Sequence, residues 1–101
     1  MKINDEMKFY IEVKNSISRL IDIYGKDLDE ETINSVNHFL DHGEYEMAYE
    51  GVFIDLISIG FNPDDIDVSH YIGIGIGLGL NKESVFDFDF WNKLNAYLNI
   101  S

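Results

Sequence analysis

Asn37 to Phe61, NHFLDHGEYEMAYEGVFIDLISIGF, is the stretch that decides how the other residues of this 101-residue chain are interpreted. After Gly43, apolar residues recur at spacings of three and four, at Tyr45, Ala48, Tyr49, Val52, Phe53, Leu56 and Ile57. Side chains at these spacings share one face of a helix. We therefore predict one helix ending at Gly43 and a second closed by Gly60. The turn between them is so short that the two helices should form an antiparallel hairpin.

Four acidic residues interrupt the apolar face of the second hairpin helix: Glu44, Glu46, Glu50 and Asp55. The alternation predicts a helix with one broad buried side and acidic positions that stay in water.

A further helix is predicted before the hairpin, from Asn4 or Asp5 to Tyr24. Its apolar stripe consists of Tyr10, Val13, Ile17, Leu20, Ile21 and Tyr24. Gly25 should stop this helix in the left-handed conformation. Asp29 is the predicted cap of the first hairpin helix, whose buried face should be Ile33, Val36, Phe39 and Leu40.

The segment after the hairpin allows more than one interpretation. Asn62-Pro63-Asp64-Asp65 predicts either a helical turn or the start of a fourth helix, with a second candidate cap at Asp67 or Ser69. Residues 70–80, HYIGIGIGLGL, alternate Gly with Ile or Leu. We favour a helix, in which Gly at i and i+4 permits close packing, over a minor β-hairpin formed within residues 70–90.

A last helix should run from Asp87 or Asp89 to Leu98. Together the elements predict an all-α fold, a compact bundle of about five helices with a central antiparallel hairpin, as a single domain over residues 1–101.

Charge is the most informative part of the composition. The net charge is −12, and the 55 residues between Lys26 and Lys82 hold twelve Asp or Glu and no Lys or Arg. Such a charge distribution attracts cationic partners and repels nucleic acid and anionic membranes.

The chain has no cysteine, no apolar run long enough to cross a membrane, and no signal-peptide pattern at MKINDEMKF. We expect a cytoplasmic protein.

The motifs of catalysis and metal binding are weak. The glycine run lacks the order of a phosphate-binding loop, and the serines lack a nucleophile-elbow context. His38 and His42, at i and i+4, could hold a metal with Asp41 or Glu46, but His42 more simply contacts the carbonyls at its helix end. We expect no catalytic residue, no metal and no cofactor, and therefore not an enzyme.

The aromatic residues should fill the core for the most part. Exposed members of the set Tyr45, Tyr49, Phe86 and Phe88 would instead be anchors of a protein interface beside the acidic residues.

The hairpin also resembles a known family. Residues 39–50, FLDHGEYEMAYE, resemble a segment of the MafI-type bacterial immunity proteins, and Ile76-Gly77-Leu78-Gly79-Leu80 followed by Trp91 and Leu94 resembles a later pattern of that family. The resemblance covers residues 36–94 and departs from the family at Gly73 and Gly75. It implies a small acidic helical protein, related to the CdiI-like proteins of contact-dependent inhibition, that neutralises a cognate toxin.

The resemblance and the charge together predict an immunity protein that binds a basic, secreted toxin domain, as a monomer or in a 1:1 complex. The toxin would be a nuclease, with an EndoU-type RNase favoured, because a nuclease must be basic where it grips phosphate. The predicted contact residues are Glu44, Glu46, Glu50, Asp64, Asp65, Asp67, Asp87 and Asp89. The alternative is a non-enzymatic acidic adaptor or nucleic-acid mimic, such as an anti-restriction protein.

Overall fold

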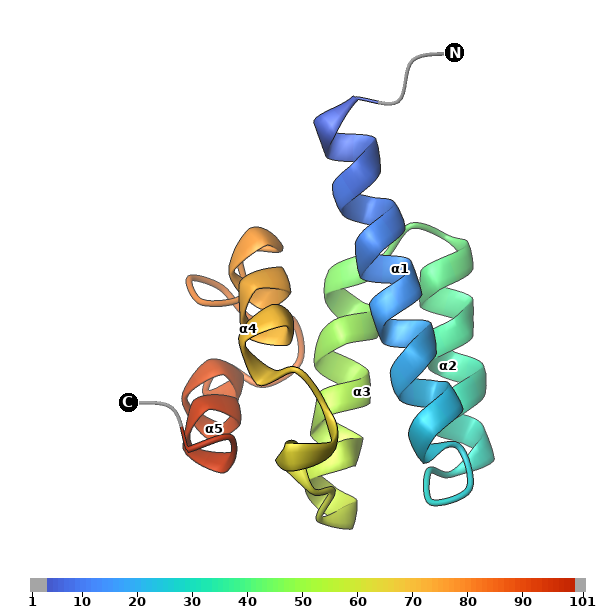
Figure 1. Cartoon of the computed structure of the whole chain (residues 1–101), viewed down its shortest axis with the longest axis vertical. Coiled ribbons are helices and arrows are strands. Elements are labelled where there is room, and N and C mark those ends of the chain that lie inside the picture. The colour runs from blue at the N-terminus through green and yellow to red at the C-terminus, as the bar shows by residue number, and fades with distance from the viewer. Residues whose placement is uncertain (1–3, 100–101) are drawn as a thin grey trace.

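The computed structural model of the chain describes residues 4–99, which form five α-helices, one short 3-10 helix and no β-strand. The helices are α1 (Asp5–Tyr24), α2 (Glu30–Asp41), α3 (Tyr45–Ile59), α4 (Val68–Gly77) and α5 (Phe90–Tyr97), with the 3-10 helix η1 (Pro63–Asp65) before α4. Helix α3 lies in the middle of the molecule, with α1 and α2 on one side and α4 and α5 on the other (Figure 1). The prediction of an all-α bundle is confirmed.

The predicted hairpin is formed by α2 and α3. Gly43 takes a left-handed conformation with φ 68°, and the backbone N–H of Glu44 donates to the carbonyl of Phe39 over 2.8 Å. The ring nitrogen Nδ1 of His42 lies 2.8 Å from the carbonyl oxygen of His38. His42 therefore contacts a carbonyl at the end of α2, as its position in the sequence predicts.

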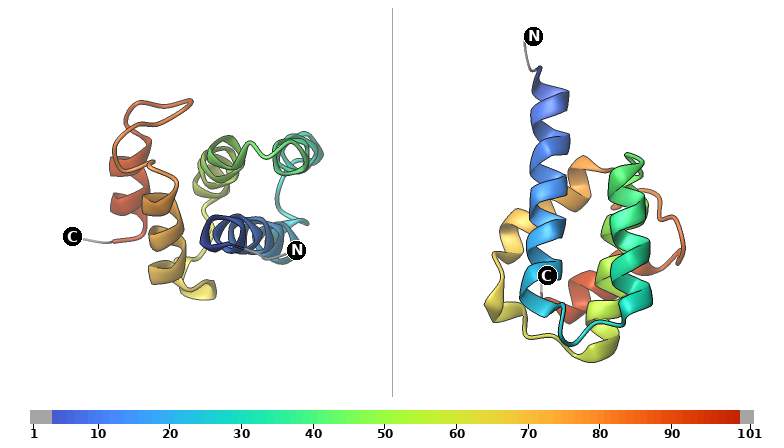
Figure 2. Two further views of the ribbon diagram at one scale, coloured as in Figure 1. Left: turned by 90° about the horizontal axis from the view of Figure 1, so that it is seen from above. Right: turned by 90° about the vertical axis from the view of Figure 1, so that its right-hand side faces the viewer.

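Helices α1, α2 and α3 form a triangle when viewed from above (Figure 2). The side chains enclosed between them come from the predicted apolar stripes and are almost completely buried: Val13, Ile17, Leu20, Val36, Leu40, Val52 and Leu56. Tyr49 and Phe53, also fully buried, continue this core towards Tyr71 of α4 and Phe90 of α5. The core thus passes through α3, whose two opposite sides are both covered.

This central position overturns one prediction. The sequence pattern places Glu50 in water, but the residue is fully buried, because α3 is covered on the side of α4 and α5 as well as on that of α1 and α2.

A second prediction, about backbone geometry, is also wrong. Gly25 follows α1 with φ −55°, a right-handed conformation, so it does not stop the helix as a left-handed residue.

The glycine run forms α4 and the turn after it, and the alternative β-hairpin is absent from the described residues. A Cβ on Gly75 would lie 2.5 Å from the Trp91 ring and 2.9 Å from the Tyr49 hydroxyl, and one on Gly77 would lie 2.6 Å from the Phe9 ring. The glycines therefore admit aromatic rings rather than a neighbouring helix backbone. Gly79, with φ 80°, turns the chain out of the helix.

The start of α4 follows the second of the two predicted caps. Asn62 caps η1 by accepting from the N–H of Asp64, and Asp67 caps α4 by accepting from the N–H of His70. Over residues 4–99, no helix combines the length and the apolar character that crossing a membrane requires.

Candidate protein-binding surface

The segment that joins α4 to α5 presents apolar side chains to solvent. We call Ser84–Asp89 the aromatic loop. Phe88 is 97% exposed, Phe86 is 53% exposed, and Val85 is also exposed. Large apolar side chains grouped on the surface mark sites of protein–protein contact more often than isolated ones do. Both phenylalanines belong to the set of aromatic residues that the sequence marks as potential interface anchors, whereas Tyr49 of that set is buried.

A buried carboxylate holds the aromatic loop in place. Oε1 of Glu50 accepts from the N–H of Val85 over 2.8 Å, and Oε2 accepts from the N–H groups of Phe86 over 2.6 Å and Asp87 over 2.8 Å. Enclosing a carboxylate costs several kcal/mol unless hydrogen bonds replace its lost water. Here three successive backbone donors supply those bonds, so the shape of the loop and the burial of Glu50 depend on each other.

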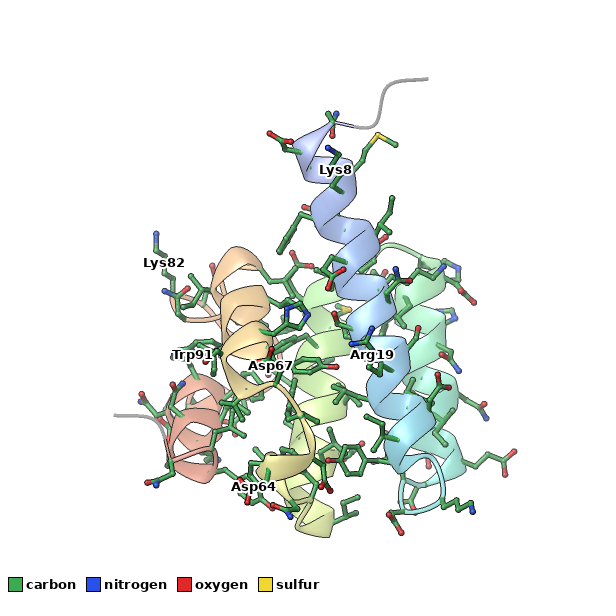
Figure 3. All side chains as sticks on the ribbon, in the orientation of Figure 1. Lys8, Arg19, Asp64, Asp67, Lys82 and Trp91 are labelled. Carbon is green, nitrogen blue, oxygen red and sulfur yellow. The ribbon has the colours of Figure 1, made fainter. Side chains whose placement is uncertain are left out.

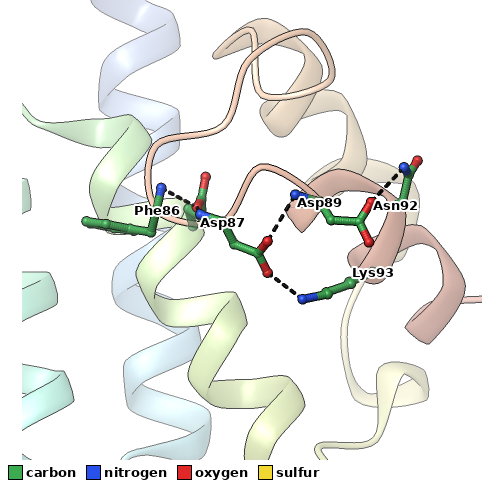
Figure 4. A network of polar contacts seen from close by, with 6 residues as sticks. Phe86, Asp87, Asp89, Asn92 and Lys93 are labelled. Atoms are coloured by element: carbon green, nitrogen blue, oxygen red, sulfur yellow. Dashed lines mark hydrogen bonds and ion pairs between the residues drawn. The ribbon is translucent and has the colours of Figure 1, made fainter.

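Acidic side chains fix the second half of the loop. The Asp87 carboxylate accepts from the backbone N–H of Asp89 over 3.0 Å and from Nζ of Lys93 over 2.7 Å, and Asn92 donates to Asp89 (Figure 4). The Lys93 hydrogen bond, followed by that from the Asp89 backbone, lowers the pKa of Asp87. Phe88 therefore stands between two carboxylates that are themselves held against the start of α5.

The first half of the loop lies against the α2–α3 hairpin. The ring centroids of Phe86 and Phe39 are 6.2 Å apart, and a Cβ added to Gly51 would lie 3.9 Å from the Phe86 ring. Beyond Phe39, a groove of about 220 Å³ between α2 and α3 is lined by acidic and polar residues that include Asp29, Glu31 and Asp55. Sequence reasoning does not select these three, since their approach depends on how the hairpin packs.

On the other flank of the loop lies a wide groove of about 600 Å³. It is lined by Glu46 of α3 and by residues that lead into the loop, among them Lys82, Glu83 and Val85. Glu46 precedes Glu50 by one helical turn, and Glu44 immediately precedes α3 at the same end. Of the predicted contact residues, Glu44, Glu46, Asp87 and Asp89 therefore belong to the region of the aromatic loop.

Asp64, Asp65 and Asp67 lie elsewhere. They follow the C-terminal end of α3 and are exposed on η1 and at the start of α4; Figure 3 labels two of them. The 15 residues of α3 span about 22 Å, which separates this group from Glu44. The eight predicted carboxylates therefore do not form one patch, and Glu50 is no contact residue, because it has no exposed surface.

Glu12, Ser16 and His70 form a cluster that resembles a catalytic triad, and two of them, Glu12 and His70, line a groove between α1 and α4. Nε2 of His70 lies 2.8 Å from the Ser16 hydroxyl and 3.1 Å from Oε1 of Glu12. In a catalytic triad the serine and the acid bond to different ring nitrogens. Here both approach the same nitrogen, and Ser16 is buried. The cluster joins α1 to α4, and Glu12 does not hold the second ring nitrogen of His70 as the acid of a catalytic triad does.

The same groove, about 280 Å³ in volume, is also lined by Arg19, Asp65, Asp67 and Tyr71. Figure 3 shows Arg19 of α1 and Asp67, which precedes α4, on the same side of the molecule. The Tyr71 hydroxyl donates to the Ser16 carbonyl over 2.7 Å and so links α4 to α1, and burial raises the pKa of this tyrosine.

Internal cations neutralise little of the acidic charge. Among residues 4–99, ion pairs join Lys93 to Asp87 and His70 to Glu12, and the second exists only when the histidine is protonated. The described part of the chain also contains no cluster of three or more His, Asp or Glu side chains suited to a metal ion.

Comparison of the chain with protein-family models, with curated proteins and with solved structures finds no match. The function therefore has to be proposed from the residues and the surface of the chain itself.

Proposed function

We propose that this chain is an immunity protein that binds and neutralises a basic toxin domain, with a nuclease such as an EndoU-type RNase as the favoured target. The observation that carries the proposal is the acidic surface. Twelve carboxylates lie between Lys26 and Lys82, and all of them except Glu50 are at least partly exposed. Among the residues that the structure describes, none of the twelve pairs with a lysine or arginine. A partner with a phosphate-binding cleft offers the complementary charge.

The proposed complex is a 1:1 complex formed in the cytoplasm, where the toxin would act. Complementary charge accelerates encounter, and association is then sensitive to ionic strength. The resemblance of residues 39–50 to MafI-type proteins supports the choice of a toxin over other basic partners. The alternative, an acidic adaptor or nucleic-acid mimic, requires carboxylates spaced along one surface as phosphates are. The predicted carboxylates instead lie in separate groups near the two ends of α3, and this arrangement does not favour a nucleic-acid mimic.

The test begins with the gene immediately upstream. We expect it to encode a longer secreted protein that ends in a basic domain, and we expect that domain to bind this chain at 1:1 stoichiometry. Co-expression should protect cells from the domain. Measuring the association rate between 50 and 500 mM salt should give a steep decrease, on the order of tenfold or more. Absence of binding and of protection would refute the proposal.

Competition with duplex DNA separates the alternative. A nucleic-acid mimic should displace DNA from several unrelated DNA-binding proteins, whereas an immunity protein should leave those complexes intact and bind its own toxin.

A further inference from the structure

We infer that the aromatic loop is the affinity-determining contact of this protein, with Phe88 inserting into an apolar pocket of the basic partner and Glu50 acting as the positioning residue beneath it. This inference rests on the proposed function for the nature of the partner. It assigns the contact to a segment that charge alone does not single out.

The exposure of Phe88 is the first observation. A phenylalanine that is 97% exposed contributes almost nothing to the stability of its own fold. Burying such a side chain in a complex removes a large apolar surface from water and so strengthens binding. Aromatic side chains that enter pockets near the centre of an interface are typical hot spots.

The second, independent observation is how the loop is built. Glu50 has no exposed surface, and both of its oxygens are used by the N–H groups of Val85, Phe86 and Asp87. A flexible loop would have to be ordered on binding, at a cost in free energy. The Glu50 bonds order the backbone of residues 85–87 beforehand, so the segment that leads to Phe88 is already in place when the partner binds.

The charges around Phe88 select its partner. Asp87, which already pairs with Lys93, and Asp89 flank it in the chain. Glu46 and Glu83 line the groove beside the loop together with one cation, Lys82. A pocket with a cationic rim matches Asp89, Glu46 and Glu83, which pair with no lysine or arginine in the described part of the chain, whereas an acidic rim would repel them. The occupant is thus the basic toxin domain rather than a second copy of this acidic chain.

The test uses the purified basic domain encoded upstream as the probe, with dissociation rates measured for three variants. Phe88→Ala should weaken binding on the order of thirtyfold, mainly through faster dissociation. Glu50→Gln should also accelerate dissociation, because the amide nitrogen cannot accept from a backbone N–H. The matched control is Ile59→Ala, which shortens an exposed apolar side chain near the other end of α3 and should bind like the wild type.

Hydrogen exchange tests the positioning role without the partner. In the wild type, the amides of Val85, Phe86 and Asp87 should be protected, and in Glu50→Gln they should exchange about tenfold faster or more, while the amides of α1 keep their wild-type rates. Equal rates in both proteins would refute the role of Glu50.

The outcomes separate the two proposals. If the wild type binds the domain and Phe88→Ala binds equally well, the aromatic loop is not the contact and the proposed function survives. If the wild type fails to bind, the proposed function falls and the partner assigned to the loop falls with it. If sedimentation instead shows that the chain self-associates through Phe88, the loop is an interface between copies and the inference is refuted.

Discussion

Similar carboxylates serve opposite purposes at the two ends of α3. In its N-terminal half, Glu50 is enclosed and its oxygens hold the backbone of the aromatic loop. Beyond its C-terminal end, Asp64 and Asp65 lie exposed on η1, where they carry charge into solvent. Both groups count equally in the net charge of −12. The same residue type therefore has two roles. A buried carboxylate supports the loop that exposes apolar side chains, and exposed carboxylates supply the charge that would attract a basic partner.

The largest effect expected from breaking this contrast is in Glu50→Ala. Three backbone N–H groups would lose their acceptor and a cavity would remain, so the free energy of unfolding should fall by about 3 kcal/mol or more. Urea denaturation measures the change. Glu46→Ala, one turn earlier and partly exposed, should change stability by less than about 0.5 kcal/mol. Equal effects in the two variants would mean that Glu50 does not support the loop.

Two glycine substitutions extend the comparison to α4, where one glycine is packed against a ring and another is open to solvent. Gly75→Ala would place a methyl group 2.5 Å from the Trp91 ring, and overpacking of this kind costs about 1–3 kcal/mol. Gly73 has no neighbour within 4 Å of the added carbon, so Gly73→Ala should stabilise the helix by about 0.5–1 kcal/mol. Thermal denaturation should shift the two midpoints in opposite directions, and shifts of the same sign would contradict the packing described for Gly75.

The elements that the sequence predicts well are those whose causes are local. The α2–α3 hairpin follows from apolar spacing and from Gly43, and the caps at Asn62 and Asp67 follow from residues two or three positions away. Such patterns lie within one or two turns of the chain, so they can be recognised without knowing how the helices pack.

The features that escape prediction depend on distant residues. The donors that bind Glu50 are 35–37 positions away in the sequence, and Gly75 makes room for a tryptophan on another helix. A glutamate between apolar helix positions indicates a solvated face by pattern alone. The later part of the chain covers the second side of α3 and buries Glu50, and the local sequence pattern contains no sign of this packing. The candidate site is therefore predicted in part, through Phe86, Phe88 and the acids beside them.

Charge reversal on η1 tests the electrostatic half of the contrast. Asp64→Lys combined with Asp65→Lys should slow association with the basic domain roughly three- to tenfold at low salt and weaken its salt dependence. Dissociation should change little, in contrast to Phe88→Ala. Asp5→Lys combined with Glu6→Lys makes the same charge change at the start of α1 and serves as the control. A dissociation rate that rises as steeply as in Phe88→Ala would place η1 inside the contact.

The smallest expected effect concerns the ion pair behind Phe88. The hydrogen bond from Lys93, and then that from the Asp89 backbone, lower the pKa of Asp87 in the folded protein. A carboxyl whose pKa is lowered on folding contributes stability above its unfolded value of about 3.9, and loses it as pH falls through the folded value.

Lys93→Gln should therefore be slightly less stable than the wild type at neutral pH, and the difference should vanish as pH falls through the lowered pKa of Asp87, where its carboxyl becomes protonated in the folded protein. Added salt should reduce the difference at neutral pH as well, because the pair is exposed. Lys82→Gln removes the same charge outside the pair, and denaturation curves at several pH values compare the two variants. If both lose stability in parallel with pH, the effect belongs to net charge, and the Asp87–Lys93 contact does not help to hold the aromatic loop at α5.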